Sequence, residues 1–289
     1  MLLVRAITVG ASLAALSAHP QAASATAAAA SAPARGPRGA PAAVAADEHQ
    51  GGTHLRIPTP HGPVHLFRPR GYDARTAGVV VYVHGYYVDV DEAWRAHRLP
   101  EQFVASGRNA LFVAPEAPSA GEEKPNWRRL QQLLNVTLRR ARWQRPRGAV
   151  VVAGHSGAFR TIVSWLEEPF WHHLILIDGL YGREEAFGAW LRHSKRNKMT
   201  LVVRGTAKWA DPFVRSRPYA VTVARIPDAF EELSRRERNA RLLAFRSQFG
   251  HFELITDGKV LPLLLGRTPL PALPAFPALP ASPASPPPR

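Results

Sequence analysis

The chain has 289 residues, a formal net charge of +15 at pH 7 and no cysteine. The lack of cysteine excludes disulfides, thiolate metal sites and a cysteine nucleophile. The cations are dispersed along the sequence, so the charge favours attraction to an anionic surface or polymer over specific recognition of nucleic acid, which needs a concentrated basic patch.

Residues 1–25 have the three regions of an export signal. Arg5 precedes an apolar run over residues 6–18, and small residues occupy positions 23–25, an order that is typical of a cleaved signal peptide. The apolar run is shorter than the ~20 residues that a membrane-spanning helix needs. We therefore expect no transmembrane segment, removal of residues 1–25, and a secreted or periplasmic protein.

Composition divides the rest of the chain into three parts. Residues 26–52 are rich in alanine and proline, and residues 268–289 have the Pro-rich sequence "TPLPALPAFPALPASPASPPPR". Both compositions predict disorder, because they provide few core residues and proline cannot donate backbone hydrogen bonds. Residues 53–267 are expected to form the folded domain.

Short apolar runs alternate with longer amphipathic stretches in this domain. The sequence "THLRIPTPHGPVHLFRP" is typical of a β-hairpin with its turn at residues 60–63. Nearly continuous runs of Val, Ile and Leu then predict strands that are buried on both faces. These runs are "AGVVVYVHG", "NALFVAPEA", "GAVVVAGHSG", "HLILIDGLYG" and "MTLVVRGTA".

Two of the stretches between these runs predict helices. One extends from Asp91 to Ser106. Asp89 before it and Glu92 in its first turn have the spacing of a capping box. The other, residues 126–143, places apolar side chains on one helical stripe. Repeated strand, helix and strand require parallel pairing with right-handed crossovers. The predicted fold class is therefore α/β, with a doubly wound, mostly parallel sheet and helices on both faces.

Residues capable of chemistry follow several of these runs, where ligands of such sheets bind. Ser156 lies in the sequence Gly154-His155-Ser156-Gly157-Ala158, directly after "AVVVA". Its small neighbours permit a sharp strand-to-helix turn that exposes the serine hydroxyl. We predict that Ser156 is a nucleophile. The backbone N–H of Gly157, at the start of the next helix, and that of Tyr86 in "HGYY" are the predicted oxyanion donors.

This set of features resembles the α/β-hydrolase superfamily over residues 53–267. The resemblance is carried by the turn at residues 154–158, the loop at residues 84–86 and the loop Gly250-His251-Phe252. It implies an α/β-hydrolase fold and an exported serine hydrolase of the esterase or lipase type, with His251 as the base of a triad. Ala158 stands where the family pattern usually has glycine, and alanine is small enough to be tolerated. No metal or cofactor is expected.

Two aspartates are candidates for the third member of the triad. Asp178 directly ends the "LILI" run, and Asp211 follows the "MTLVVR" run at some distance. Members of the superfamily often carry the acid three residues after a glycine here, but that position holds Lys208. We favour Asp178, because a residue at a strand end is better fixed in space, and keep Asp211 as the alternative.

The expected reaction is two-step acyl transfer, with cleavage of a carboxylic ester in a small molecule or a polymer. The same triad would serve an amidase, a peptidase or an esterase acting on a polysaccharide. A catalytically silent binding protein with a hydrolase-like fold is the alternative from another class. Residues 219–241 could form a wall or lid over the site, or an outer helix. The sequence predicts neither the substrate nor the oligomeric state.

Overall fold

The computed structural model describes residues 45–274, which belong to one compact unit. The expected signal peptide, residues 26–44 of the expected linker and residues 275–289 of the expected tail lie outside this range. No helix within residues 45–274 is long and apolar enough to cross a membrane.

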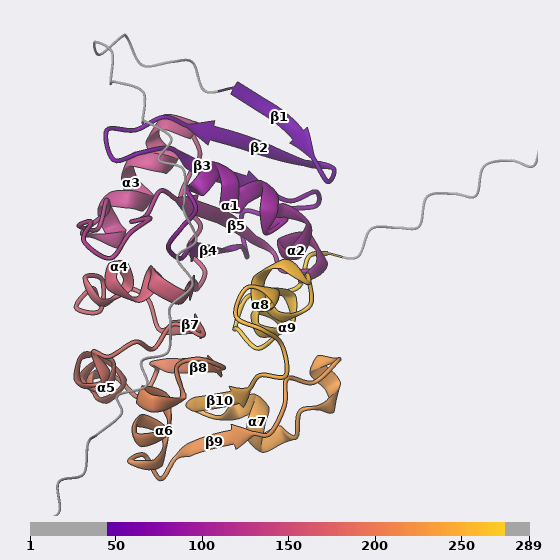
Figure 1. Ribbon diagram of the computed structural model, residues 1–289. Coiled ribbons are helices and arrows are strands. Elements are labelled where there is room, and N and C mark those ends of the chain that lie inside the picture. Colours follow the sequence, from indigo (N-terminus) through magenta and orange to yellow (C-terminus); the bar gives the residue numbers. More distant parts are fainter. Residues whose placement is uncertain (1–44, 275–289) are drawn as a thin grey trace, which may run out of the picture. The chain divides into compact units, whose positions relative to one another are not determined.

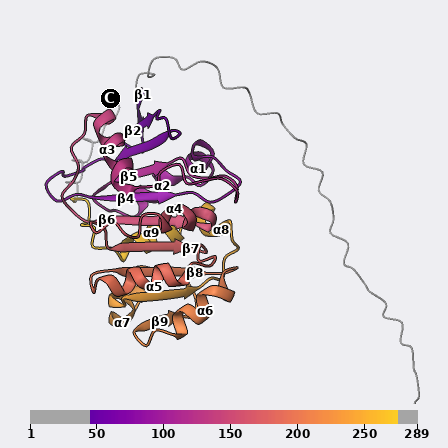
Figure 2. The same ribbon diagram turned by 90° about the vertical axis from the view of Figure 1, so that its left-hand side faces the viewer.

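A mixed sheet forms the centre of this unit (Figure 1). Its strand order is β1-β2-β3-β5-β4-β6-β7-β8-β10-β9, which runs from top to bottom in Figure 2. The first three strands pair antiparallel, and β3 also pairs antiparallel with β5. All pairs from β5 to β9 in this order are parallel. The strands are β1 (Ala45–His49), β2 (Gly52–Ile57), β3 (Val64–Arg68), β4 (Gly78–Val83), β5 (Ala110–Pro115), β6 (Val150–His155), β7 (His173–Ile177), β8 (Lys198–Val203), β9 (Ala220–Val223) and β10 (Leu242–Arg246).

Helices cover both faces of the sheet, so the predicted doubly wound architecture is confirmed. In strand β4, Val79 and Val81 pack into one apolar cluster and Val80 and Tyr82 into the other, because successive side chains of a strand point to opposite faces. One face carries α3 (Leu130–Ala141), α4 (Phe159–Val163), α5 (Glu184–His193) and α6 (Ala207–Arg215). The other carries α1 (Val90–Ala96), α2 (Leu99–Ala105), α8 (Glu253–Thr256) and α9 (Val260–Gly266).

The helix expected from Asp91 to Ser106 is two helices, α1 and α2. Asp89 caps the first as predicted, since its Oδ1 accepts the Glu92 N–H at 2.7 Å. The break falls at Arg98, whose φ of 50° is left-handed, and Pro100 follows in the first turn of α2. In one continuous helix Pro100 could not donate to the Ala96 carbonyl and its ring would clash with that turn, so the break falls before it.

Helix α3 begins at Leu130, later than the predicted start at residue 126. The Glu168 carboxylate accepts the N–H groups of Leu130 and Gln131 at 2.6 and 2.9 Å and so satisfies two amides that a helix start leaves unpaired. Trp127 precedes the helix, and its carbonyl accepts a hydrogen bond from the indole of Trp165. A contact that is distant in sequence therefore fixes the start of this helix.

Regular structure and packing contacts extend beyond both ends of the predicted domain of residues 53–267. Strand β1 pairs with β2 through the turn Gln50–Gly51, so the predicted boundary at Thr53 falls inside a hairpin. At the other end, Leu270 is buried and the Asn109 N–H donates to the Pro271 carbonyl at 2.8 Å. Strand β1 pairs with β2, and Ala272 forms an isolated antiparallel bridge with Arg108 just before β5, so tertiary contacts place both segments although their own composition is poor in core residues.

Residues 219–241 form neither a lid nor one outer helix. They contain the edge strand β9, the 3₁₀ turn η2 (Phe230–Glu232) and the short helix α7 (Arg235–Asn239). Strand β9 pairs in parallel with β10. None of these residues lines the cavity around Ser156.

Candidate active site

Ser156 lies on a sharp turn between β6 and the 3₁₀ turn η1 (Ser156–Ala158), which continues into α4. Its φ of 52° is left-handed, a conformation that is strained for a non-glycine residue. Helix α4 packs so closely on β6 that a Cβ atom on Gly154 would lie 2.5 Å from Ile162 Cδ1. Glycine at position 154 therefore permits the turn that exposes the serine, as the sequence predicts.

The structure brings Ser156, His251 and Asp178 together. His251 follows β10, and its Nε2 lies 3.0 Å from Ser156 Oγ. Its Nδ1 lies 2.7 Å from Asp178 Oδ2, and Asp178 directly follows β7. An ionised carboxylate only accepts hydrogen bonds, so Nδ1 carries the proton and Nε2 is free to accept the serine hydroxyl.

The Asp178 carboxylate is held by a dense set of donors and has no exposed surface. Its Oδ1 accepts from the amides of Arg204 and Thr206 and from the Thr206 hydroxyl, at 2.8–3.0 Å. Its Oδ2 accepts from the Gly205 amide and from His251. Burial alone would raise the pKa of Asp178, but these hydrogen bonds outweigh burial and hold its pKa well below the usual range. The carboxylate is therefore ionised at neutral pH.

The alternative acid, Asp211, lies elsewhere. It is inside α6, and its Oδ1 forms an ion pair with Arg246 Nη2 at 2.6 Å. The loop after β8 does not fold back to carry it to His251. Instead, the amides of that loop bind Asp178.

The two predicted oxyanion donors border the same space as Ser156. A Cβ atom on Gly85 would lie 2.9 Å from Ser156 Cβ, and one on Gly157 would lie 2.4 Å from Tyr86 Cε1. The loop after β4 therefore lies directly against the serine turn, with the Tyr86 ring over Gly157. The Tyr87 N–H donates to the Ser119 carbonyl at 2.8 Å, which fixes the loop in this position.

His84 ties the same loop to its surroundings. Its Nε2 accepts the Ala117 N–H at 3.0 Å, and its Nδ1 donates to the Gly85 carbonyl at 2.8 Å. The ring is buried and does not line the cavity. It contacts the loop rather than the reacting atoms.

His155, which directly precedes Ser156, also contacts the site. It is buried, and its Nε2 donates to the backbone carbonyl of His251 at 3.1 Å. The two rings pack with their centroids 4.5 Å apart. Burial, and secondarily the neighbouring His251, lowers the pKa of His155 to about 3, so its ring is neutral. No local sequence signal predicts this contact across 96 positions.

A cavity of about 740 Å³ opens beside Ser156 and His251. Its walls are mainly aromatic, and Arg160 and Arg183 also line it. Burial and the charge of Asp178 raise the pKa of Tyr181, while a hydrogen bond with Ser156 lowers it, so this hydroxyl is protonated at neutral pH. The aromatic lining residues are Tyr86, Tyr87, Phe159, Tyr181 and Phe252.

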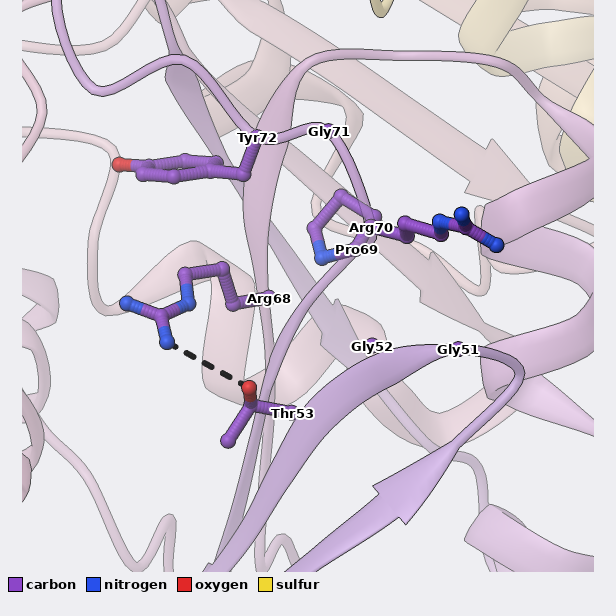
Figure 3. A pocket seen from close by; sticks show the side chains of 8 residues that line it. All are labelled: Gly51, Gly52, Thr53, Arg68, Pro69, Arg70, Gly71 and Tyr72. Atoms are coloured by element: carbon purple, nitrogen blue, oxygen red, sulfur yellow. Dashed lines mark hydrogen bonds between the residues drawn. The ribbon is translucent and has the colours of Figure 1, made fainter. Parts of the chain in front are cut away.

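A second pocket, of about 250 Å³, lies at the far end of the β1–β2 hairpin. Figure 3 shows Arg68 reaching towards Thr53, with its Nη2 donating to the threonine hydroxyl at 3.4 Å. The lining residues include neither a serine, a histidine nor a carboxylate, so this pocket lacks the groups for acyl transfer. No cluster of three or more potential metal ligands occurs among residues 45–274.

Comparisons with known proteins give a fold but no close relative. No protein-family model matches the chain, and no curated protein matches its sequence. Among solved structures, the protein FAE is similar with a TM-score of 0.50 and 10% identity, over 75% of this chain and 89% of that chain. The feruloyl esterase module from Clostridium thermocellum has a TM-score of 0.48 and 9% identity, over 74% and 87%. An S-formylglutathione hydrolase from Agrobacterium tumefaciens has a TM-score of 0.47 and 10% identity, over 77% of this chain and 98% of that chain.

At sequence identities this low, the comparisons bear on the fold alone. The strand order, the parallel pairing and the serine turn after β6 agree with the fold that the sequence resemblance implies. The chain has an α/β-hydrolase fold.

Proposed function

We propose that this protein is a serine hydrolase that cleaves carboxylic esters through an acyl-enzyme. The observation that supports this most strongly is the continuous set of hydrogen bonds from the buried Asp178 carboxylate through His251 to the Ser156 hydroxyl. A serine hydroxyl 3.0 Å from an imidazole nitrogen can pass its proton to that nitrogen as it attacks.

In the first step, Ser156 Oγ forms a bond to the ester carbonyl carbon while its proton passes to His251 Nε2. The carbonyl electron pair moves to the oxygen, which the N–H groups of Gly157 and Tyr86 would stabilise. Collapse of this intermediate breaks the bond to the alcohol oxygen, which takes the proton from Nε2. The alcohol leaves, and Ser156 carries the acyl group.

In the second step, water takes the place of the alcohol. His251 Nε2 accepts a proton from the water as the water oxygen attacks the acyl carbon, and returns it to Ser156 Oγ as that bond breaks. Asp178 keeps Nδ1 protonated and offsets the positive charge that His251 carries in both steps. We propose an ester because an alcohol leaves more readily than an amine, although the same triad and two backbone donors also serve amidases and peptidases.

The proposal includes export. The sequence of residues 1–25 supports it, and these residues lie outside the described range. The mass of the mature protein recovered from a bacterial host tests this part: cleavage after residue 25 is expected, and retention of residues 1–25 in the exported protein would contradict it.

Hydrolysis of p-nitrophenyl butyrate by the purified protein tests the enzymatic part. Ser156→Ala is expected to abolish the enzyme-catalysed rate. Ser216→Ala is the matched control, because Ser216 caps the end of α6 and does not line the cavity. Equal rates for Ser156→Ala and the parent, or no hydrolysis by the parent, would favour the silent binding protein.

A further inference from the structure

The cavity beside Ser156 has a positive charge that the acyl-transfer steps do not use. Arg160 and Arg183 line it, and no aspartate or glutamate does. The rest of its wall is mainly aromatic. A site for a neutral acyl chain needs no cation, so these two residues require a separate explanation.

Arg160 points its guanidinium along the cavity wall. It lies in the first turn of α4, directly after the serine turn, and lines the same cavity as Ser156. Its Nη1 donates to the Tyr86 hydroxyl at 3.3 Å. A Cβ atom on Gly121 would lie 4.0 Å from both this Nη1 and the Tyr86 ring, so a glycine leaves the space beside the guanidinium open.

Neither arginine has an acidic partner within residues 45–274, where Arg160 donates only to the Tyr86 hydroxyl. A guanidinium has five N–H donors in a rigid fork, so most of those of Arg160 remain available to a ligand. Arg183 is exposed and lines the same cavity, so it adds to the positive potential there.

We propose that the substrate ester carries a carboxylate group, which Arg160 binds while Arg183 adds to the positive potential. This inference rests on the proposed ester hydrolysis. A planar carboxylate fits the arginine fork with two parallel hydrogen bonds, and the aromatic walls accept the apolar or aromatic body of the same molecule. The carboxylate belongs either to the acyl part or to the alcohol part.

Two pairs of substrates test the proposal and distinguish the two positions. For the acyl part, the p-nitrophenyl monoester of glutaric acid is compared with its methyl diester. For the alcohol part, 4-acetoxybenzoate is compared with methyl 4-acetoxybenzoate. Each pair differs in one charge, and the ratio of kcat/KM within a pair does not depend on the fraction of active protein. Enzyme-free rates are subtracted, because a carboxylate can assist hydrolysis of its own ester.

The charged member of at least one pair is expected to react about tenfold faster, the size expected for one charge-assisted hydrogen-bonded pair. Arg160→Gln should lower that ratio to about one, and Arg160→Lys should restore part of it. Arg75→Gln is the control, because its exposed side chain pairs with Asp73 and lies outside the cavity lining.

The two proposals fail in different ways. If no ester, charged or neutral, is hydrolysed in a Ser156-dependent manner, the proposed function is wrong. If neutral esters are hydrolysed through Ser156 but both ratios are near one, or Arg160→Gln leaves the ratio unchanged, the carboxylate proposal alone is wrong.

Discussion

Asp178→Asn removes the charge behind His251 while changing the side-chain shape very little. In the parent, Oδ1 accepts from the Arg204 amide, the Thr206 amide and the Thr206 hydroxyl, and Oδ2 accepts from the Gly205 amide and His251. An asparagine has one accepting oxygen. Its best placement keeps the oxygen at the Oδ1 position with three donors, and its NH₂ group then faces Gly205 and His251.

Both groups that face the NH₂ are affected. His251 Nδ1 must accept a hydrogen bond from the new NH₂ group, so the ring proton moves to Nε2. The ring can then no longer take the Ser156 proton. This wrong tautomer lowers kcat by about 10⁴-fold in triads of this kind. The Gly205 amide loses its acceptor, but Gly205 is exposed and water can take its place, so the free energy of unfolding should fall by only about 1 kcal/mol.

The assay measures kcat for p-nitrophenyl butyrate together with Tm. Asp211→Asn is the matched control: it breaks a partly exposed ion pair with Arg246, which contributes about 0–1 kcal/mol, and its kcat should stay near the parental value. A kcat for Asp178→Asn close to that of the parent, or a large loss of kcat in Asp211→Asn alone, would refute the assignment of the acid.

Further variants probe the groups around the serine turn. Gly157→Ala should lower kcat/KM strongly, because the new Cβ would lie 2.4 Å from Tyr86 Cε1 and displace that loop; Gly266→Ala, whose Cβ would meet nothing closer than 3.5 Å, should keep parental activity, and equal rates for the two would contradict this argument. His155→Leu should lower kcat about tenfold with little change in KM, since it loses one hydrogen bond to the His251 carbonyl; an unchanged kcat would count against a positioning role. The folded state holds the pKa of His155 at about 3, against 6.5 in the unfolded state. The unfolded state therefore binds the proton more tightly, and stability falls as pH decreases from 6.5 towards 3. Over this range, Tm should fall less steeply in His155→Leu than in the parent.

The sequence predicts the parallel strands because their pattern is local. Runs such as the one that forms β4 are apolar at every position, and such runs suit strands that are buried on both faces. The turn at Ser156 is also marked locally, since glycine stands at positions 154 and 157, where the Ile162 side chain and the Tyr86 ring approach closely.

The parts that the sequence does not predict depend on contacts between distant segments. The short strand β1 has no apolar pattern of its own, and its pairing with β2 orders it. The choice between Asp178 and Asp211 depends on the loop after β8, whose amides converge on one carboxylate and not the other. The orientation of Arg160 is set by Tyr86, which is 74 positions away.

The identity of the nucleophile is the central claim, and covalent labelling measures it most directly. Trypsin should release residues 148–160, in which Ser156 is the only serine, so the mass of this peptide identifies the labelled residue. After treatment with a fluorophosphonate, we predict one adduct per chain on this peptide and none in Ser156→Ala. An unlabelled 148–160 peptide in the catalytically active parent protein would contradict the account.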